Sequence, residues 1–418
     1  MDDQRLIREK INRSHRSQGH RTHVTCDFVT CDFFIVFFFC FFTGCANVNI
    51  PNMNDNAFQL EDDERRLMIR SRDVIEAIDT SGGLYQDRAL DNYLTGIARQ
   101  FVPPGHASDY LDVQVRVIRD PFTNAFALPN GRIYFHSGML AMLDNEAQLA
   151  TVLAHEMTHV LYRHKLKENR SYTNKLAFFA TLNAPLGVFA FGPIFNQLTA
   201  LSSITGYTRS LEYEADEHGF GELLSHGYEV NESPKTFERL KIFLEDEEVE
   251  VPFFFSTHPH VVDRIKNFEQ FKENRKGQIS TQAKVGREEF MAVTRDLKLD
   301  TISLWMDNGM FKTAQKNLDR FLEYFPDSAD GFFLKGELLR QKKDKGEDNL
   351  AKALEAYDQA IALNAQMADA YKGKGRVFKR LNEPAKAKEA FEKYLALQPG
   401  APDRLYIEEA IRMLEAAQ

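Results

Sequence analysis

Two histidines and a glutamate are spaced for metal chemistry in the stretch TVLAHEMTHVLYRH, residues 151–164, at positions His155, Glu156 and His159. On a helix, residues four apart share one face, so both imidazoles can converge on one ion. Neutral imidazole is a preferred zinc ligand. Glu156 lies one residue, about 100° around the helix, from His155, so it can reach a water beside the ion without binding the ion itself. The spacing therefore indicates a hydrolytic zinc site with Glu156 as general base.

The alternative is a pair of structural histidines on an ordinary helix. The flanking positions that share the helix are mostly apolar: Leu149, Val152, Leu153, Met157, Val160 and Leu161. Such a helix, from about residue 145 to 164, is largely buried, and two histidines without partners would be costly there. The apolar context therefore favours the metal site. His164 follows one turn later, and we expect it to mark the exposed end of the helix.

A catalytic zinc needs a third protein ligand and one open position. The stretch TRSLEYEADEHGF, residues 208–220, offers Glu212 and Asp216 four residues apart on a helical pattern. Glu212 can bind the ion, while Asp216 can orient a ligand imidazole from behind. Glu214 and Glu217 lie in the same stretch, so the residue types alone leave the choice of acid open.

A third polar patch, STHPHVVDRI, spans residues 256–265. His258 can supply a fourth ligand or polarise a substrate carbonyl, and Arg264 can do the latter. The alternative is a proline-containing turn that leads into a helix, and for His260 we prefer it.

Other stretches predict the elements that hold these residues. Residues 59–101 predict two helices, and alternating residues predict strands at 111–118 and 131–138 with a turn-rich loop between them. Residues 176–208 carry no charge over 33 positions. The alternatives are an element that contacts a membrane or grips the substrate, and a buried segment over the active site. Prolines, glycines and amides interrupt this segment, which argues against a membrane-spanning helix and favours a buried or interfacial segment.

The last third of the chain contains a repeat. Residues 353–364 match residues 387–398, so that Ala353 recurs as Ala387 at an offset of 34, and residues 314–326 are an earlier copy. A 34-residue period with small and aromatic residues at these positions is typical of tetratricopeptide repeats rather than of an arbitrary helical hairpin. About three repeats suffice to bury a continuous core and to leave a peptide-binding face.

The N-terminus predicts a targeting segment. All four cysteines lie within the first 45 residues, and an apolar run from Phe33 to Phe42 precedes Cys45. The run is too short to span a bilayer and fits a signal peptide. Its end resembles a bacterial lipobox, which predicts lipid attachment at Cys45; the alternatives are a plain signal peptide or an uncut anchor. The basic residues lie far upstream, so we expect the true start downstream of Met1, by about 25 residues.

Composition narrows the class of protein. The chain has 418 residues, 27% of them charged, and a net charge of −9. This balance lacks the excess of basic residues that is typical of nucleic-acid-binding proteins. The boundaries that we predict are a signal segment at 1–45, a tether at 46–58, a peptidase domain at 59–272, a linker at 273–289 and repeats at 290–418.

Four motifs together resemble one enzyme family. NAFALPNGRIYFHSGML, HEMTH, EYEAD and THPHVVDRI are similar to the HtpX-like zinc metallopeptidases, which include the CAAX prenyl proteases, and the signal and repeats add a likeness to the BepA-like periplasmic branch. The resemblance implies zinc on His155, His159 and Glu212, Glu156 as general base and acid, Asp216 behind a ligand, and His258 at the fourth zinc position in a latent state. It also implies a substrate groove along an edge strand, for which residues 131–138 fit.

The sequence thus predicts an α+β zincin-like metallopeptidase domain, mostly helical with a small sheet, followed by an all-α tetratricopeptide solenoid. We expect a zinc endopeptidase that cleaves misfolded or stalled envelope proteins, anchored by lipid on the periplasmic side of the outer membrane. Its repeats would bind clients or envelope assembly machinery. The alternative is a tetratricopeptide adaptor or chaperone with a latent peptidase domain.

Overall fold

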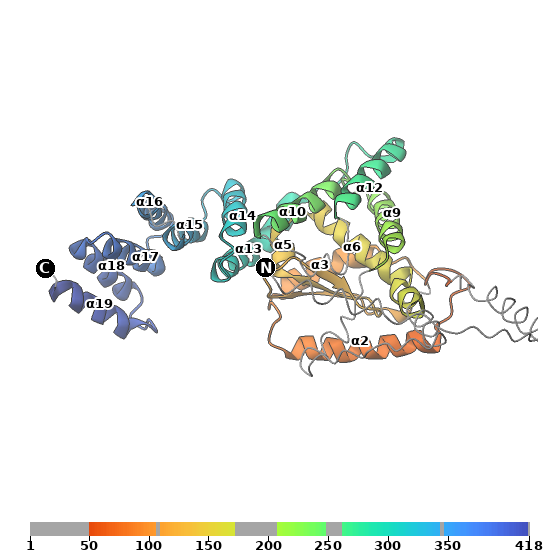
Figure 1. Cartoon of the computed structure of the whole chain (residues 1–418), viewed down its shortest axis with the longest axis horizontal. Coiled ribbons are helices and arrows are strands. Elements are labelled where there is room, and N and C mark those ends of the chain that lie inside the picture. The colour runs from red at the N-terminus through yellow and green to blue at the C-terminus, as the bar shows by residue number, and fades with distance from the viewer. Residues whose placement is uncertain (1–49, 106–108, 172–206, 248–260, 343–346, 417–418) are drawn as a thin grey trace, which may run out of the picture. The chain divides into compact units, whose positions relative to one another are not determined.

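The computed structural model describes residues 50–105, 109–171, 207–247, 261–342 and 347–416 (Figure 1). Cys45, His258 and most of the uncharged segment 176–208 lie outside these ranges. The described residues belong to one compact unit. No helix within the described ranges has the length and apolar content needed to cross a bilayer.

A three-stranded sheet lies at the centre of the first half. Its strands are β1 (Gln114–Ile118), β2 (Ala125–Ala127) and β3 (Arg132–His136), in the order β1-β3-β2. β3 pairs parallel with β1 and antiparallel with β2. The predicted strands at 111–118 and 131–138 are therefore confirmed. The expectation that residues 131–138 form an edge strand is wrong, because β3 is paired on both sides.

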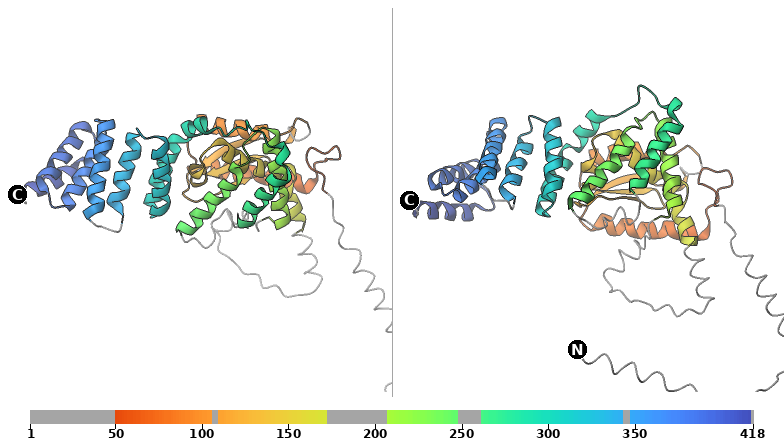
Figure 2. Two further views of the ribbon diagram at one scale, coloured as in Figure 1. Left: turned by 90° about the horizontal axis from the view of Figure 1, so that it is seen from above. Right: turned by 45° about the horizontal axis from the view of Figure 1, so that its top comes forward.

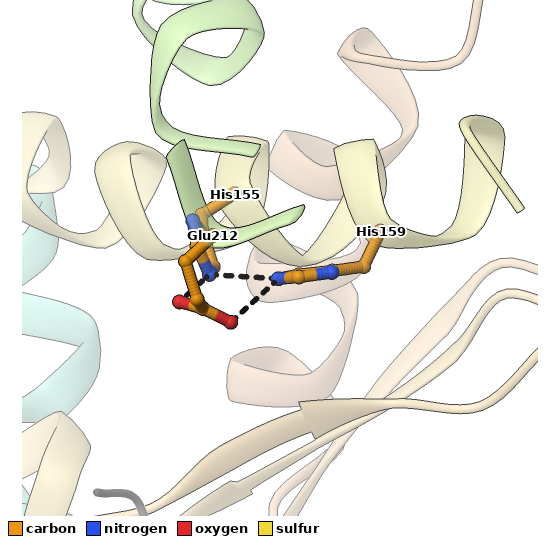
Figure 3. A group of neighbouring side chains, drawn as sticks. All are labelled: His155, His159 and Glu212. Carbon is orange, nitrogen blue, oxygen red and sulfur yellow. Dashed lines mark hydrogen bonds and ion pairs between the residues drawn. The ribbon is translucent and has the colours of Figure 1, made fainter. Parts of the chain in front are cut away.

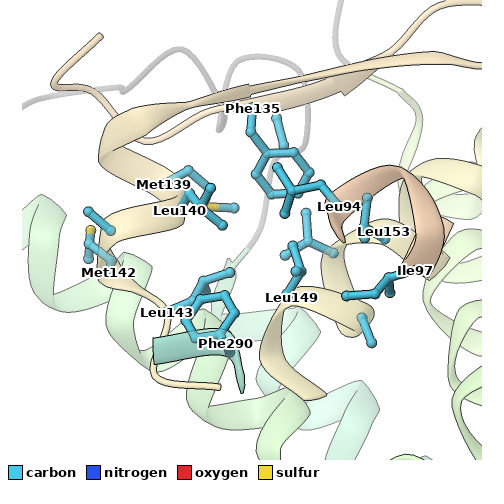
Figure 4. Packing of buried hydrophobic residues seen from close by; sticks show 14 of the residues in the cluster. Leu94, Ile97, Phe135, Met139, Leu140, Met142, Leu143, Leu149, Leu153 and Phe290 are labelled. Atoms are coloured by element: carbon cyan, nitrogen blue, oxygen red, sulfur yellow. The ribbon is translucent and has the colours of Figure 1, made fainter. Parts of the chain in front are cut away.

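Helices cover both faces of this sheet (Figure 1). On one face, Tyr134 of β3 donates a hydrogen bond to Asp79 of α2 (Asp62–Thr80). On the other, Phe135 packs with α3 (Arg88–Gln100) and α6 (Glu146–Leu161) in the main core (Figure 4). This alternation follows from the period of two along a strand. The other helices among the described residues of this half are α5 (Ser137–Met142), α9 (Arg209–Ser225), α10 (Glu232–Glu247) and α12 (Val261–Asn274), with a short 3-10 turn η2 (Lys276–Gln278).

Antiparallel helices make up the second half (Figure 2). They are α13 (Arg287–Asp307), α14 (Phe311–Tyr324), α15 (Ala329–Gln341), α16 (Glu347–Leu363), α17 (Ala368–Arg380), α18 (Pro384–Leu397) and α19 (Arg404–Ala416). Neighbouring helices interlock through glycine against aromatic rings. A Cβ on Gly336 or Gly373 would come within 2.5 Å of the Tyr357 ring, so no larger residue fits without a shift. This pattern explains the small and aromatic positions of the 34-residue period.

The main core crosses from the first half into the repeats. Phe290 and Trp305 of α13 belong to the same buried cluster as α3, α5 and α6, and the cluster reaches Leu338 of α15. Trp305 donates its indole N–H to the carbonyl of Pro121 at 2.7 Å. Helices α16 to α19 have two smaller core clusters of their own. The first helices of the solenoid are therefore part of the fold that holds α6.

Two flanking segments secure the ends of α6. The carbonyls of Val285 and Gly286 accept hydrogen bonds from the backbone N–H groups of Ala147 and Glu146 at its start, which have no partner within the helix. At the other end, the N–H of Met53 bonds to the carbonyl of Leu161 at 2.9 Å. Residues 50–58, which the polar composition suggests as a tether, thus pack against the end of α6, and residues 285–286 of the predicted linker pack against its start.

Candidate metal centre

His155 and His159 lie on one face of α6, which is buried along its whole length. Asn145 caps this helix, since its side-chain oxygen accepts from the N–H of Gln148 at 3.0 Å. The Nε2 atoms of the two histidines are 3.0 Å apart. The predicted convergence of the two imidazoles is therefore observed.

Glu212 of α9 completes a triangle with these two histidines (Figure 3). Its Oε2 lies 3.5 Å from Nε2 of His155, and its Oε1 lies 3.5 Å from Nε2 of His159. Tetrahedral zinc with bonds of 2.0–2.2 Å separates its ligand atoms by about 3.3–3.6 Å. The two nitrogen–oxygen distances lie in this range, and the 3.0 Å between the two Nε2 atoms is slightly shorter. The three buried residues can each offer one ligand atom to a single ion, which fits a zinc site with one position left for water or substrate.

A glycine allows α9 to approach α6 this closely. A Cβ on Gly219 would lie 3.3 Å from the backbone nitrogen of His155 and 3.4 Å from the carbonyl carbon of Ala154. Glu217 and Glu214 do not contact the ligand histidines, since Glu217 pairs with Arg275 at 3.6 Å and Glu214 with His164 at 3.3 Å. Among the acids that the residue types left open, Glu212 is the one at the histidines.

Glu156 lies beside this triangle and contacts the sheet. Its Oε2 accepts a hydrogen bond from the backbone N–H of Ala127 in β2 at 3.0 Å, and its side chain is 1% exposed. Asn124 and Leu128 exchange backbone bonds with β3, so the backbone groups of Ala125 and Ala127 point away from β3. β2 is thus the edge strand at the site, whereas the sequence predicted only a loop between the two strands. A strand of three residues is too short to show an alternation.

Asp216 and Arg264 lie behind His155. Asp216 Oδ1 is 3.0 Å from His155 Nδ1 and 2.6 Å from Arg264 Nη2. Arg264 Nη2 is also 2.8 Å from His155 Nδ1. When Nε2 of His155 faces a metal, Nδ1 carries the hydrogen, so the last contact joins two donors and is not a hydrogen bond. Asp216 then accepts from both, which holds the His155 ring in the tautomer that a metal requires.

Arg264, which the sequence suggests as a group for a substrate carbonyl, is only 2% exposed. Besides Asp216, its guanidinium lies 3.7 Å from Glu212 Oε2 and over the ring of Phe237 at 4.2 Å. Arg264 lies on α12 and from there contacts both Glu212 and Asp216 of α9. A role at the substrate stays a prediction.

Two further residues at the site are missing from the sequence-based set. Tyr207 stacks on the His159 ring with 3.9 Å between centroids, and burial raises its pKa well above the usual value. His164 is fully buried, with Nδ1 2.8 Å from Nδ1 of His159, so the expectation of an exposed helix end is wrong. Burial lowers the pKa of His164, while its contact with Glu214, 3.3 Å from Nε2 to Oε2, lowers the pKa of that carboxyl to about 2. His258 and Cys45 lie outside the described residues.

Comparisons with known proteins agree with this architecture. Residues 89–272 match the model of peptidase family M48, and residues 305–348 and 345–412 match tetratricopeptide repeat models. The chain therefore carries an M48 peptidase domain followed by tetratricopeptide repeats, which confirms the predicted fold class.

Individual relatives match only part of their own length. The mitochondrial metalloendopeptidase OMA1 of Arabidopsis thaliana is 30% identical over 185 residues, 43% of this chain and 37% of that protein. A putative beta-barrel assembly-enhancing protease of Vibrio cholerae is 32% identical over 194 residues, 43% of this chain and 38% of that protein. The crystal structure of MamA is 26% identical, covering 31% of this chain and 73% of that chain with a TM-score of 0.26. The chain thus spans well under half the length of these two curated relatives.

Proposed function

We propose that this chain is a zinc-dependent endopeptidase of the bacterial cell envelope that cleaves misfolded or stalled proteins and binds clients or partners through its repeats. The observation that carries the peptidase role is the buried triangle of His155, His159 and Glu212 with Glu156 beside it. A metal held there supplies a Lewis acid that acidifies water and polarises a peptide carbonyl.

Glu156 is placed to move the protons of hydrolysis. Glu156 follows His155 by one position on α6. Its carboxylate accepts a hydrogen bond from the N–H of Ala127 at 3.0 Å, which fixes it beside the triangle. From there it takes a proton from the attacking water and passes it to the leaving amine nitrogen.

The outward edge of β2 is the proposed binding site for the substrate. The backbone groups of Ala125 and the carbonyl of Ala127 face away from β3, so an extended peptide can pair with them as an added strand, while the N–H of Ala127 donates to Glu156. Such pairing uses main-chain groups and selects weakly for side chains. It therefore favours unfolded or incompletely assembled chains over folded ones.

The location and the partners rest on the sequence and on relatives. The lipobox-like end at Cys45 supports a lipid anchor, and the name of the Vibrio cholerae relative supports an envelope role, although other relatives are mitochondrial. Expression with Cys45→Ala tests the anchor: the variant should leave the membrane fraction on carbonate extraction. Retention of the variant in the membrane would contradict a lipid anchor at Cys45.

The first experiment measures zinc per purified chain of residues 46–418, in wild type and in Glu212→Gln and Glu156→Gln. We expect about one zinc in wild type, a large loss in Glu212→Gln, and retained zinc without proteolysis of an unfolded substrate in Glu156→Gln. Folded wild type without zinc would contradict the metal site. Cleavage by Glu156→Gln at the wild-type rate would contradict the assigned base, and zinc without cleavage in wild type would favour the adaptor with a latent peptidase domain.

A further inference from the structure

A residue in the left-handed conformation separates the end of α6 from the helical turn that follows it. α6 ends at Leu161, helical structure resumes at residue 164, and Arg163 between them has φ of 57°. A left-handed conformation is costly for a residue other than glycine and persists where surrounding contacts determine it. Arg163 supplies such contacts, because its guanidinium bonds to Glu64 at 2.9 Å and to the carbonyl of Pro51 at 2.9 Å.

This break folds His164 back onto a metal-site residue. In a continuous helix, residues five apart point about 140° away from each other, so His159 and His164 could not meet. Here their Nδ1 atoms lie 2.8 Å apart and their rings meet edge to face at 4.8 Å. His164 is fully buried. The left-handed residue therefore brings a second imidazole behind His159.

One arrangement of hydrogens satisfies all of these contacts. Nε2 of His159 faces the triangle, so its hydrogen is on Nδ1, which donates to Nδ1 of His164. His164 then carries its hydrogen on Nε2, which lies 3.3 Å from Oε2 of Glu214, within ion-pair distance of that carboxylate. Lys167 lies 3.5 Å from the Glu214 carboxylate and holds it from the other side.

We propose that His164 and Glu214 position His159 for metal binding, as Asp216 positions His155. His164 accepts the Nδ1 hydrogen of His159 and so fixes both its ring orientation and its tautomer. Glu214 fixes the tautomer of His164 in turn. The two histidine ligands therefore have different supports, a carboxylate directly behind one and an imidazole–carboxylate chain behind the other. This inference rests on the proposed zinc site.

The test compares the zinc affinity of matched variants, all made in the chain of residues 46–418. His164→Leu removes the acceptor, whereas His164→Asn keeps an acceptor oxygen near the position of Nδ1. Partners of this kind change metal affinity by about 10–100-fold. We expect His164→Leu to weaken zinc binding within that range and His164→Asn to restore most of it. His218→Leu is the control, since His218 packs on Tyr162 and is not part of the triangle.

A second pair of variants keeps the test decisive if His164→Leu does not fold. Glu214 is the last of the two side chains behind His159 and is partly exposed, so Glu214→Ala is a milder change. We expect about tenfold weaker zinc binding in this variant, at the low end of such effects. Glu217→Ala on the same helix is its control, because Glu217 pairs with Arg275. Zinc affinity is measured by competition with a chromophoric chelator, the visible spectrum of the cobalt-substituted protein reports the ligand geometry, and thermal melts of the zinc-free proteins report folding.

The outcomes separate this inference from the proposed function. Absence of zinc binding in folded wild type overturns the proposed site and the inference with it. Wild-type affinity and cobalt spectrum in both His164→Leu and Glu214→Ala overturn the inference alone. Equal weakening in His164→Asn and His164→Leu shows that packing rather than the hydrogen bond matters, and it also overturns the inference. Weakening in His164→Leu and Glu214→Ala, with rescue in His164→Asn and unchanged controls, is the expected result.

Discussion

The backbone N–H of Ala127 donates to the carboxylate of Glu156 over 3.0 Å, which ties the proposed base to the free edge of the sheet. Proline at position 127 removes this donor without removing a bond to β3, because the N–H of Ala127 points away from β3. We expect Ala127→Pro to lower kcat at least tenfold, since general bases typically contribute about 10²–10⁴-fold, while zinc stays bound.

Ala125→Pro is the matched control for this prediction. Its N–H also points outward from β2, and it has no bond to Glu156 in the described contacts. Kinetics on an unfolded protein substrate and zinc content decide the outcome. Equal losses of kcat in both variants would mean that the strand edge, and not the bond to Glu156, limits the reaction.

Asp216 accepts hydrogen bonds from two donors, His155 and Arg264. A substitution of Asp216 leaves both donors without this buried acceptor. Asp216→Asn keeps the volume and one acceptor oxygen but removes the charge that balances Arg264. Groups behind a ligand histidine typically contribute about 10–100-fold to metal affinity, so we expect zinc to bind weaker by that factor. Chelator competition measures it, with Glu217→Gln as a control on the same helix. An unchanged affinity would show that Asp216 serves only the fold.

The i, i+4 spacing was enough to predict that His155 and His159 converge, because helix geometry alone brings them together. It could not choose Glu212 among the acids of α9. That choice depends on the direction from which α9 crosses α6, which Gly219 permits by close backbone approach. The resemblance to a known family supplied the choice before the packing explained it.

Two features depend on tertiary structure that no local pattern reveals. His164 reaches His159 only because Arg163 is left-handed, and a helical wheel places the two apart. Similarly, the predicted repeat range of 290–418 includes most of α13, but the period gives no sign that this helix packs into the peptidase core. Periodicity predicts which face of an element is buried; it does not identify the partner.

Arg163 and Glu64 form a buried ion pair between the end of α6 and α2, with both side chains at most 5% exposed. Truncation of one partner of such a pair leaves the other charge unpaired and costs about 3–5 kcal/mol. We therefore expect Arg163→Ala to lower the free energy of unfolding by that amount, as measured by urea denaturation of the zinc-free protein. Arg170→Ala is the comparison, because Arg170 makes similar pairs with Glu61 and Asp63 near the surface. A loss below 1 kcal/mol for Arg163→Ala would contradict the prediction.

Lys298 of α13 is buried, with Nζ donating to the carbonyls of Ala141 and Leu143 at 2.8 and 2.6 Å. Burial, together with repulsion from Arg320, lowers its pKa to about 7, although Asp144 opposes this. The unfolded chain, with an ordinary lysine pKa of about 10.4, therefore binds more protons between these two values. The penalty for burying the charge is present in full below pH 7 and is lost as the pH rises, so stability should increase with pH.

The increase attributable to Lys298 from pH 7 to 9 is about 2 kcal/mol. It is measured as the difference between wild type and Lys298→Met in denaturation at several pH values. The methionine has similar length and does not titrate, so other groups cancel in the difference. Parallel curves for the two proteins would show that Lys298 stays charged in this range.

The shared core predicts where the chain can be cut. Residues 287–342 place Phe290, Trp305 and Leu338 in the cluster that also holds α6, and each large core side chain of this kind contributes about 3–5 kcal/mol. Their joint loss, about 9–15 kcal/mol, is as large as the typical 5–15 kcal/mol stability of a domain. A chain of residues 50–286 should therefore fail to melt cooperatively or to hold zinc, although it contains every proposed ligand. A chain of residues 50–342 keeps the whole cluster and lacks only helices with cores of their own, so it should melt cooperatively and bind one zinc. Cooperative melting of residues 50–286 at the temperature of the longer chain would show that the peptidase domain folds without the first repeat helices.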